Sequence, residues 1–301
     1  MVTPAGANVT LGEADEGPND PLLLALVRAA RAGAQAILAE RDGLPESLTT
    51  KADGSPVTRA DHAAEAAILA VLDRECPGLP IVSEEGGGEP SGALARLDLA
   101  RLDPASPFLL VDPLDGTRDF IEGHDEFTVN VALIEDARPR AGCVVAPALD
   151  HLWCARDDAA WTCRAGSWRR LDARREAGPL RVAVSRSHCD AATRAFLHRL
   201  RPCRTLTFGS SLKLCRVADG WADLYPRFGG TMQWDIAAGD AVLRAVGGRV
   251  TDLRGEPIRY GHDPLGGWRN PPFLARRGAV PGADPKELLE AARRAAGDTA
   301  D

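Results

Sequence analysis

Two aspartates, a glycine and a threonine stand close together at the end of an apolar stretch. The segment reads Phe108-Leu-Leu-Val, then Asp112-Pro-Leu-Asp115-Gly116-Thr117. Four apolar residues in a row predict a buried strand, and the proline, which lacks an N–H, should end its ladder. The glycine lets a ligand approach the backbone, and the threonine occupies a helix N-cap position. Such a strand end offers carboxylates to cations and free N–H groups to phosphate oxygens.

Three further acids lie at the ends of predicted elements. Glu84 follows a short strand at 79–82, and Asp235 precedes a helix at 236–246. Asp61 falls in the first turn of a helix capped by Thr58, where a carboxylate also suits the helix dipole. Loops at strand ends gather at one edge of an α/β sheet, so we expect Glu84 and Asp235 to join the first two aspartates.

This convergence requires cations. Two carboxylates about 4 Å apart repel each other by about 4 kcal/mol at an effective dielectric constant of about 20. An all-oxygen ligand set selects Mg²⁺ over zinc, and His124 is the one histidine or cysteine near these acids in the sequence. A two-metal centre would activate a water and neutralise the leaving oxygen of a phosphoester. Thr117 would help to orient that water, with Asp61 as its acceptor and base.

Composition limits the class of protein. The chain has 301 residues, is 45% hydrophobic and carries a formal net charge of −7. That charge argues against broad nucleic-acid binding. There is no uninterrupted apolar run of 18 residues and no basic, then apolar, N-terminal segment, so we expect neither a transmembrane helix nor a secretory signal. Seven scattered cysteines predict reduced thiols in a cytosol.

The order of elements predicts an α+β first half and an alternating α/β second half. Expected helices cover 21–40, 59–74, 190–200, 209–217, 236–246 and 285–296, and expected strands cover 128–134, 141–146, 151–154, 159–163, 180–184, 205–208, 222–225 and 250–252. A polar, arginine-rich stretch at 172–178 predicts an inter-domain loop, and 89–106 a loop excursion. We divide the chain into a disordered tail (1–19), an α+β metal-binding domain (20–147), an α/β substrate-recognition domain (148–280) and a C-terminal helix and tail (281–301).

Three motifs, in this order, resemble the signatures of the lithium-sensitive, Mg²⁺-dependent inositol monophosphatase superfamily. They are Glu84-Glu85, Asp112-Pro-Leu-Asp115-Gly116-Thr117 and Trp234-Asp235-Ile-Ala-Ala-Gly239. The resemblance implies a layered αβαβα sandwich of the sugar-phosphatase type, holding two or three Mg²⁺ ions. The implied metal ligands are Glu84, Asp112, the carbonyl of Leu114, Asp115 and Asp235. The implied catalytic residues are Asp61, Thr117 and Glu84.

Further segments resemble the CysQ-type 3'(2'),5'-bisphosphate nucleotidases, which remove the 3'-phosphate of adenosine 3',5'-bisphosphate, a by-product of sulfate assimilation. These segments cover 51–61, 127–135, 185–188, 209–213 and 224–228. The resemblance implies a set of substrate contacts: Gly116, Thr117, Ser187, His188, Ser211, Lys213, Arg227 and Asp235. Cationic and hydroxyl groups of this kind suit a phosphate that is bound without being cleaved.

Two alternatives remain open on the sequence. One is another phosphatase of the same superfamily, acting on inositol monophosphate, histidinol phosphate or fructose 1,6-bisphosphate. The other is a catalytically silent nucleotide-binding regulator, against which the intact acidic set argues, because a silent relative is expected to lose one of its members. We expect a cytoplasmic protein, at most peripheral to the inner membrane, that forms a homodimer and binds a small phosphorylated nucleotide rather than nucleic acid.

Overall fold

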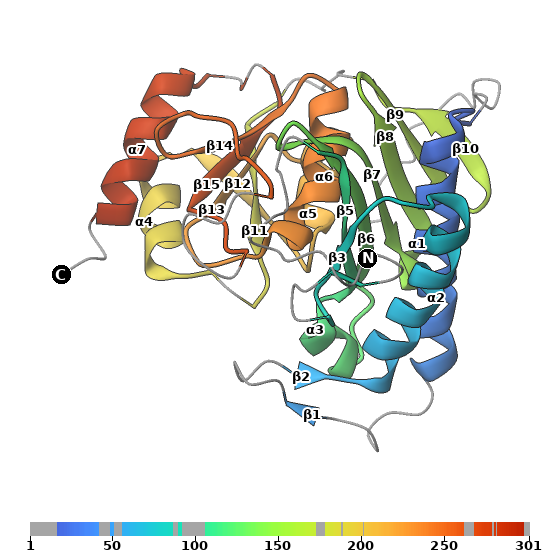
Figure 1. Cartoon of the computed structure of the whole chain (residues 1–301). Coiled ribbons are helices and arrows are strands. Elements are labelled where there is room, and N and C mark those ends of the chain that lie inside the picture. The colour runs from blue at the N-terminus through green and yellow to red at the C-terminus, as the bar shows by residue number, and fades with distance from the viewer. Residues whose placement is uncertain are drawn as a thin grey trace.

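The computed structural model describes residues 17–41, 49–50, 56–86, 90–91, 106–172, 178–187, 189–200, 202–261, 268–278, 280 and 282–297. The expected N-terminal tail, most of the excursion at 89–106, the centre of the loop at 172–178 and His188 lie wholly or largely outside these ranges. The described elements form five layers, which Figure 1 shows from α1 and α2 on one side to α4 and α7 on the other. The αβαβα arrangement implied by the resemblance is therefore confirmed.

The first sheet has eight strands in the order β10-β9-β8-β7-β6-β5-β3-β4. Its strands are β3 (Ile81–Ser83), β4 (Pro90–Ser91), β5 (Phe108–Asp115), β6 (Thr128–Glu135), β7 (Arg138–Ala146), β8 (His151–Arg156), β9 (Ala159–Arg164) and β10 (Ser167–Arg170). One face is covered by α1 (Pro21–Glu40) and α2 (Arg59–Glu75), with the small pair β1 (Thr49–Thr50) and β2 (Pro56–Val57) nearby. A short helix, α3 (Thr117–Ile121), follows β5, and the 3₁₀ turn η4 (Pro147–Leu149) joins β7 to β8.

The position of β5 between two cores explains why it begins with four consecutive apolar residues. Leu109 and Val111 belong to the core under α1 and α2, while Phe108 and Leu110 belong to the core shared with the second sheet. Both faces of the strand are covered, so neither set of alternating side chains meets water. The strand end that carries the acids is consequently held from both sides.

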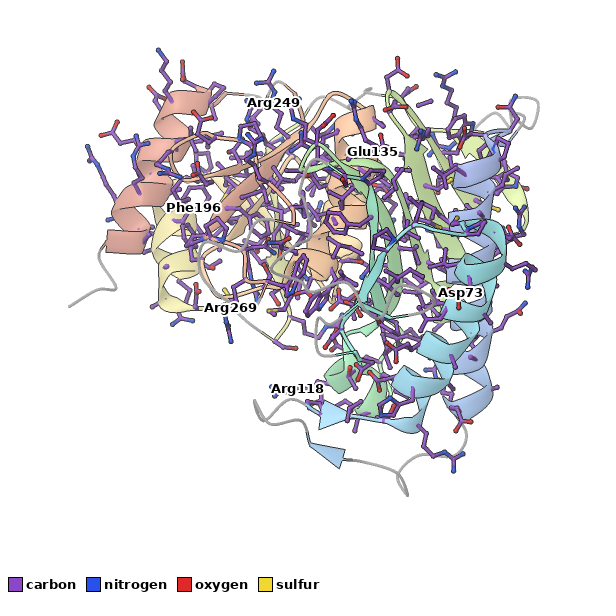
Figure 2. The ribbon with its side chains drawn as sticks, viewed as in Figure 1. Asp73, Arg118, Glu135, Phe196, Arg249 and Arg269 are labelled. Carbon is purple, nitrogen blue, oxygen red and sulfur yellow. The ribbon has the colours of Figure 1, made fainter. Side chains whose placement is uncertain are left out.

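The second sheet has five strands in the order β12-β11-β13-β15-β14. Its strands are β11 (Leu180–Ser185), β12 (Cys203–Phe208), β13 (Leu224–Arg227), β14 (Arg249–Asp252) and β15 (Phe273–Arg276). Strands β11, β12 and β13 are parallel, whereas β15 runs antiparallel to both of its neighbours. Helices α5 (Leu212–Ala218) and α6 (Gln233–Ala245) lie between the two sheets, and α4 (Ala191–Arg199) and α7 (Pro285–Gly297) cover the outer face. Figure 2 shows side chains filling these layers; the labelled Phe196 belongs to α4 and is fully buried.

Helix α6 is packed on every side because it lies between two sheets. Ten of its residues are buried, among them Ala237, Ala238 and Gly239, the small face noted in the sequence. A helix that is apolar around its whole circumference is typical of this position. Gly142 of β7 meets this small face, and its missing side chain lets backbone approach backbone.

Helix α1 has a length and composition that would also fit a membrane span, although its sequence lacks an uninterrupted apolar run of 18 residues. Half of its most apolar window is buried within the protein, against α2 and the strands β6 and β7. Asp20 caps it by accepting a hydrogen bond from the N–H of Leu23 at 2.7 Å. In this structure the apolar face of α1 therefore forms part of the core.

Four details differ from the expectations. The boundary at 147/148 cuts through the first sheet, because β8, β9 and β10 continue it as antiparallel hairpins from β7. Strand β5 does not end at Pro113 but resumes pairing at Asp115 after an irregularity that accommodates the proline. Gly116, at φ 92°, is the N-cap residue of α3, and Thr117 is its first helical residue. Strands β10 and β15 were not predicted, since both are short and lack clear alternation.

Candidate active site at the edge of the first sheet

Three carboxylates from distant parts of the chain meet at the end of β5. Glu84 follows β3, Asp112 lies on β5, and Asp235 is in the first turn of α6. One oxygen from each lies within 4.8 Å of the others. Strands β3 and β5 are parallel neighbours, which explains why Glu84 reaches the same edge as Asp112. The expected convergence of Glu84 and Asp235 with Asp112 is confirmed.

The environment of Asp112 is suited to a cation. Its side chain is fully buried; Oδ1 accepts a hydrogen bond from the N–H of Leu114 at 3.1 Å, and Oδ2 has no partner among the described residues. Burial, then the charges of Glu84, Asp115 and Asp235, raise the pKa of Asp112 well above its usual value. A bound divalent ion would reverse this shift by pairing with the ionised forms.

The neighbouring aspartates are affected in the same way. Burial, followed by the charges of Asp115 and Glu84, raises the pKa of Asp235 well above its usual value. Burial raises the pKa of Asp115 to about 6, and the nearby Lys213 ammonium partly opposes that rise. The four acids thus act on one another electrostatically. All their donor atoms are oxygens, which is the ligand type that hard ions such as Mg²⁺ prefer.

Thr117 and Asp61 form a hydrogen-bonded pair beside this cluster. Thr117 Oγ1 lies 3.1 Å from Asp61 Oδ1 and 3.1 Å from the carbonyl oxygen of Leu114, both of which can accept its proton. The other Asp61 oxygen accepts from the N–H and the hydroxyl of Thr58, each at 2.7 Å. The capping box at the start of α2 therefore fixes the carboxylate that faces Thr117. A hydroxyl has one proton and two lone pairs, so Thr117 can accept from a water while it donates to Asp61.

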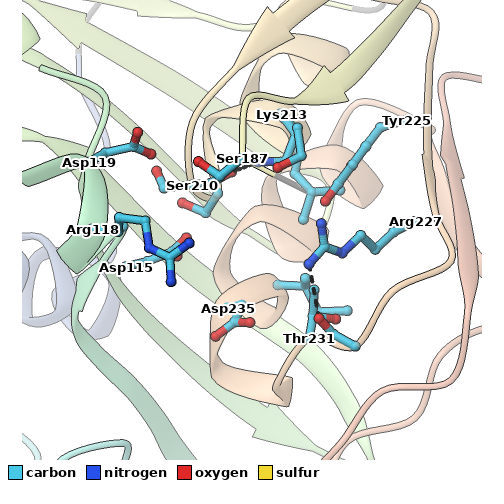
Figure 3. A pocket seen from close by; sticks show the side chains of 16 residues that line it. Asp115, Arg118, Asp119, Ser187, Ser210, Lys213, Tyr225, Arg227, Thr231 and Asp235 are labelled. Atoms are coloured by element: carbon cyan, nitrogen blue, oxygen red, sulfur yellow. Dashed lines mark hydrogen bonds between the residues drawn. The ribbon is translucent and has the colours of Figure 1, made fainter. Parts of the chain in front are cut away.

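A cavity of about 240 Å³ opens next to the acids, between the two halves of the chain. Figure 3 shows Lys213 and Arg227 on one side of it and Asp115 and Arg118 on the other. Its lining includes Gly116, Ser187, Ser211, Lys213, Arg227 and Asp235. Six predicted substrate contacts therefore share one cavity, whereas Thr117 is not part of the lining.

The two buried cations of the cavity, Lys213 and Arg227, are held by backbone carbonyls. Lys213 donates to the carbonyl of Ser210, and Arg227 donates to the carbonyls of Gly229 at 3.2 Å and Gly230 at 2.9 Å. Burial lowers the pKa of Lys213 to about 8, while the charge of Asp115 opposes the shift. Both side chains are almost fully buried, which makes their charges effective toward an anion in the cavity.

A chain of hydroxyl groups ties the cavity to the first sheet. Thr128 Oγ1 of β6 lies 3.1 Å from Ser210 Oγ and 2.7 Å from Ser211 Oγ, and the latter donates to Asn130 Oδ1 at 2.7 Å. Ser210 adopts φ 38°, an unusual conformation for a residue with a side chain. These hydrogen bonds hold in place the loop that contains Ser210, whose carbonyl oxygen accepts from Lys213.

The sequence reasoning missed several members of the cavity lining: Arg118, Asp119, Ser185, Ser210, Tyr225 and Thr231. Ser185, Ser210 and Tyr225 lie within segments that had been singled out, and the other three lie close to such segments. The signal that would have found Arg118 and Asp119 is their place in the first turn after the Asp115-Gly116 corner. The contact of Tyr225 with the cavity depends on how β13 lies against α5, the helix that carries Lys213.

Comparison with known proteins connects this geometry with one family. Residues 19–297 match the model of the inositol monophosphatase family. The chain is 43% identical over 245 residues to the 3'(2'),5'-bisphosphate nucleotidase CysQ of Shigella flexneri, covering 81% of this chain and 95% of that protein. It is 42% identical over 245 residues, with the same coverage, to CysQ of Escherichia coli K12. The crystal structure of CysQ from Bacteroides thetaiotaomicron superposes with a TM-score of 0.72 at 32% identity, covering 86% of this chain and 97% of that one.

Proposed function

Because the chain belongs to the inositol monophosphatase family, whose members are metal-dependent phosphatases, we propose that it is a Mg²⁺-dependent 3'(2'),5'-bisphosphate nucleotidase. Its substrate would be adenosine 3',5'-bisphosphate, from which it removes the 3'-phosphate. The observation that carries the proposal is the placement of Glu84, Asp112 and Asp235 next to a cavity with two buried cations. The acidic cluster suits hydrolysis of one phosphate, and the two buried cations suit binding of a second phosphate that is not cleaved.

The metal ligands in this proposal are Glu84, Asp112, the carbonyl of Leu114, Asp115 and Asp235. The unpartnered buried oxygen of Asp112 and the all-oxygen donor set support Mg²⁺, in two or three sites. When bound, Mg²⁺ supplies positive charge that makes a water more acidic and neutralises the leaving oxygen. The protein contributes the fixed positions of the carboxylates, which the strand end of β5 and the first turn of α6 provide.

The proton of the attacking water is handled by the chain itself. Thr117 accepts a hydrogen bond from the water while its own proton points at Asp61 Oδ1. Asp61 then serves as the base, and its second oxygen stays bound to Thr58. Glu84, a member of the acidic cluster, assists by accepting a hydrogen bond from a second water. This division of roles follows from hydroxyl and carboxylate hydrogen-bonding capacity.

Recognition of the uncleaved phosphate is assigned to the second half of the chain. Lys213 and Arg227 supply the charge, while Ser187, His188 and Ser211 supply further polar contacts. Gly116 and Asp235 border the cleaved phosphate. Charge-assisted hydrogen bonds to phosphate contribute about 1.5–3 kcal/mol each, enough to favour a bisphosphate over a monophosphate. We place the protein in the cytoplasm as a homodimer.

A phosphate-release panel tests the proposal. The purified chain is assayed with and without Mg²⁺ on adenosine 3',5'-bisphosphate, inositol monophosphate, histidinol phosphate and fructose 1,6-bisphosphate. We expect the highest kcat/KM for the bisphosphate nucleotide and no turnover without a divalent ion. Preference for one of the other three compounds would assign the chain to another activity of the family. Absence of orthophosphate from all four would favour a silent nucleotide-binding regulator.

A further inference from the structure

A second group of metal-binding side chains lies at the end of α3. It consists of Asp119, Glu122 and His124, and one ligand atom from each lies within 4.8 Å of the others. His124 Nε2 is 3.5 Å from Glu122 Oε2. Two ligands of a tetrahedral ion at about 2.1 Å from the metal are about 3.4 Å apart, so this pair already has the required spacing.

The backbone holds the three residues in this arrangement. The N–H of His124 donates to the carbonyl of Asp119 at 2.8 Å, and the N–H of Glu122 donates to the carbonyl of Arg118 at 3.0 Å. These bonds end α3 and turn the chain so that the residue five positions after Asp119 returns to it. Glu122 and His124 have side chains that are 55% and 41% exposed, so each can rotate to complete a coordination sphere.

Asp119 differs from a surface carboxylate in a way that points to a cation. It is only 5% exposed, and its Oδ1 has no hydrogen-bond partner among the described residues. A buried carboxylate oxygen without a donor is costly unless a proton or a cation neutralises it. Within the described part of the chain, no ion pair within 4 Å is formed by Asp119; Lys213 interacts with it electrostatically across the cavity, but its ammonium donates to the carbonyl of Ser210. A metal ion held between Asp119 and the two exposed ligands would supply that cation.

We propose that Asp119, Glu122 and His124 bind a divalent transition-metal ion such as Zn²⁺, at a site separate from the acidic cluster of Glu84, Asp112 and Asp235. The imidazole nitrogen is the reason for the choice, because nitrogen ligands suit Zn²⁺ and disfavour Mg²⁺. Three protein ligands leave one position for water. Asp119 also lines the substrate cavity, where Figure 3 shows it near Ser210, so the ion lies at the edge of that cavity.

Equilibrium dialysis against Zn²⁺ in excess Mg²⁺ tests this site. The Mg²⁺ occupies the all-oxygen centre, and metal bound per chain is measured for the wild type, His124→Asn, Glu122→Gln and a matched control, His198→Asn. His198 is an exposed histidine in the last turn of α4. We expect about one additional zinc ion in the wild type and the control. In His124→Asn and Glu122→Gln, its affinity should fall by more than about tenfold.

A spectroscopic measurement separates the two centres. Co²⁺ replaces Zn²⁺ in the same buffer, and visible absorption typical of a nitrogen-containing, low-coordinate site should appear in the wild type and disappear in His124→Asn. Equal zinc binding by the wild type and His124→Asn would overturn the proposal. So would loss of the additional ion in Asp112→Asn with retention in His124→Asn, since the ion would then belong to the acidic cluster. Neither readout requires phosphatase activity, so failure of the proposed function leaves this test intact.

Discussion

The close contact between Gly142 and α6 allows a sharp test of how the acidic cluster is assembled. A methyl group at Gly142 would lie 2.6 Å from the carbonyl oxygen and 2.8 Å from the Cα of Ala238. Both atoms are backbone of α6, so no side chain can move aside. Restoring a contact of about 3.5 Å requires α6 to shift by roughly 0.7–0.9 Å. Asp235 is in the first turn of the same helix and would shift with it.

For Gly142→Ala we expect losses of both stability and activity. Overpacking of this kind costs about 1–3 kcal/mol, which corresponds to a decrease in Tm of roughly 2–5 °C for a chain of this size. A displacement of about 1 Å at a reacting centre can cost about 10²-fold in rate. We therefore expect kcat to fall by one to two orders of magnitude at a temperature where the variant is fully folded. Differential scanning calorimetry and a steady-state phosphatase assay measure the two effects.

Gly33→Ala is the matched control. A methyl group there would lie 2.7 Å from Cδ1 and Cγ1 of Ile68, which are the flexible end of a side chain between α1 and α2. Its kcat should equal that of the wild type. If Gly142→Ala loses stability but keeps full kcat, the position of α6 on the first sheet does not determine the geometry of the acidic cluster. If its Tm is unchanged, the steric argument itself is wrong.

Four other outcomes are expected. Asp112→Asn should lower kcat by at least about 10²-fold while the protein stays folded, and near-normal turnover would exclude its metal role. Lys213→Ala and Arg227→Ala should each raise KM for adenosine 3',5'-bisphosphate about 10–100-fold, and much less for inositol monophosphate; equal effects would remove them from recognition. Thr128→Val should cost about 1–3 kcal/mol and raise KM, with Thr128→Ser restoring both; a normal KM in the valine variant would show that the hydroxyl chain does not position the cavity loop. Burial lowers the pKa of His151 to about 3. Below about pH 6.5 the unfolded chain therefore binds a proton on this imidazole, whereas the folded protein does not. Stability should therefore fall between pH 7 and 5 by about 1 kcal/mol after allowance for its partial exposure, and His151→Phe should lose this dependence; an identical pH profile in both proteins would contradict it.

Local sequence signals predicted most of the elements because each depends on neighbouring residues. Pro21 after Asp20 marked the start of α1, and Thr58 followed by Asp61 marked the capping box of α2. Alternating residues marked the hairpin of β6 and β7. Such signals act within a few residues, and they do not state which sheet a strand joins. That is why the expected boundary at 147/148 falls inside the first sheet, which β8, β9 and β10 continue.

The site residues likewise divide into those that local sequence predicted and those that depended on the tertiary structure. The types and spacing of Asp112, Asp115, Gly116 and Thr117 indicated metal and phosphate chemistry, since they occupy one strand-to-helix corner. The partnership of Thr117 with Asp61, 56 positions apart, was expected from their chemistry and from the family resemblance, and the structure places their side chains 3.1 Å apart. The hydroxyl chain from Thr128 to Ser211 had no local sequence signal, because it joins β6 to the loop between β12 and α5, more than 80 positions away.

The sequence by itself determined which chemical groups are present and which strand ends and helix starts carry them, because caps, turns and apolar periodicity are local properties. Only the tertiary structure decided that Glu84, Asp112 and Asp235 meet and that Lys213 and Arg227 face the same cavity. The physical reason is that these meetings depend on layer packing. Parallel pairing of β3 with β5 and the close seating of α6 on Gly142 set distances that no short window of sequence contains.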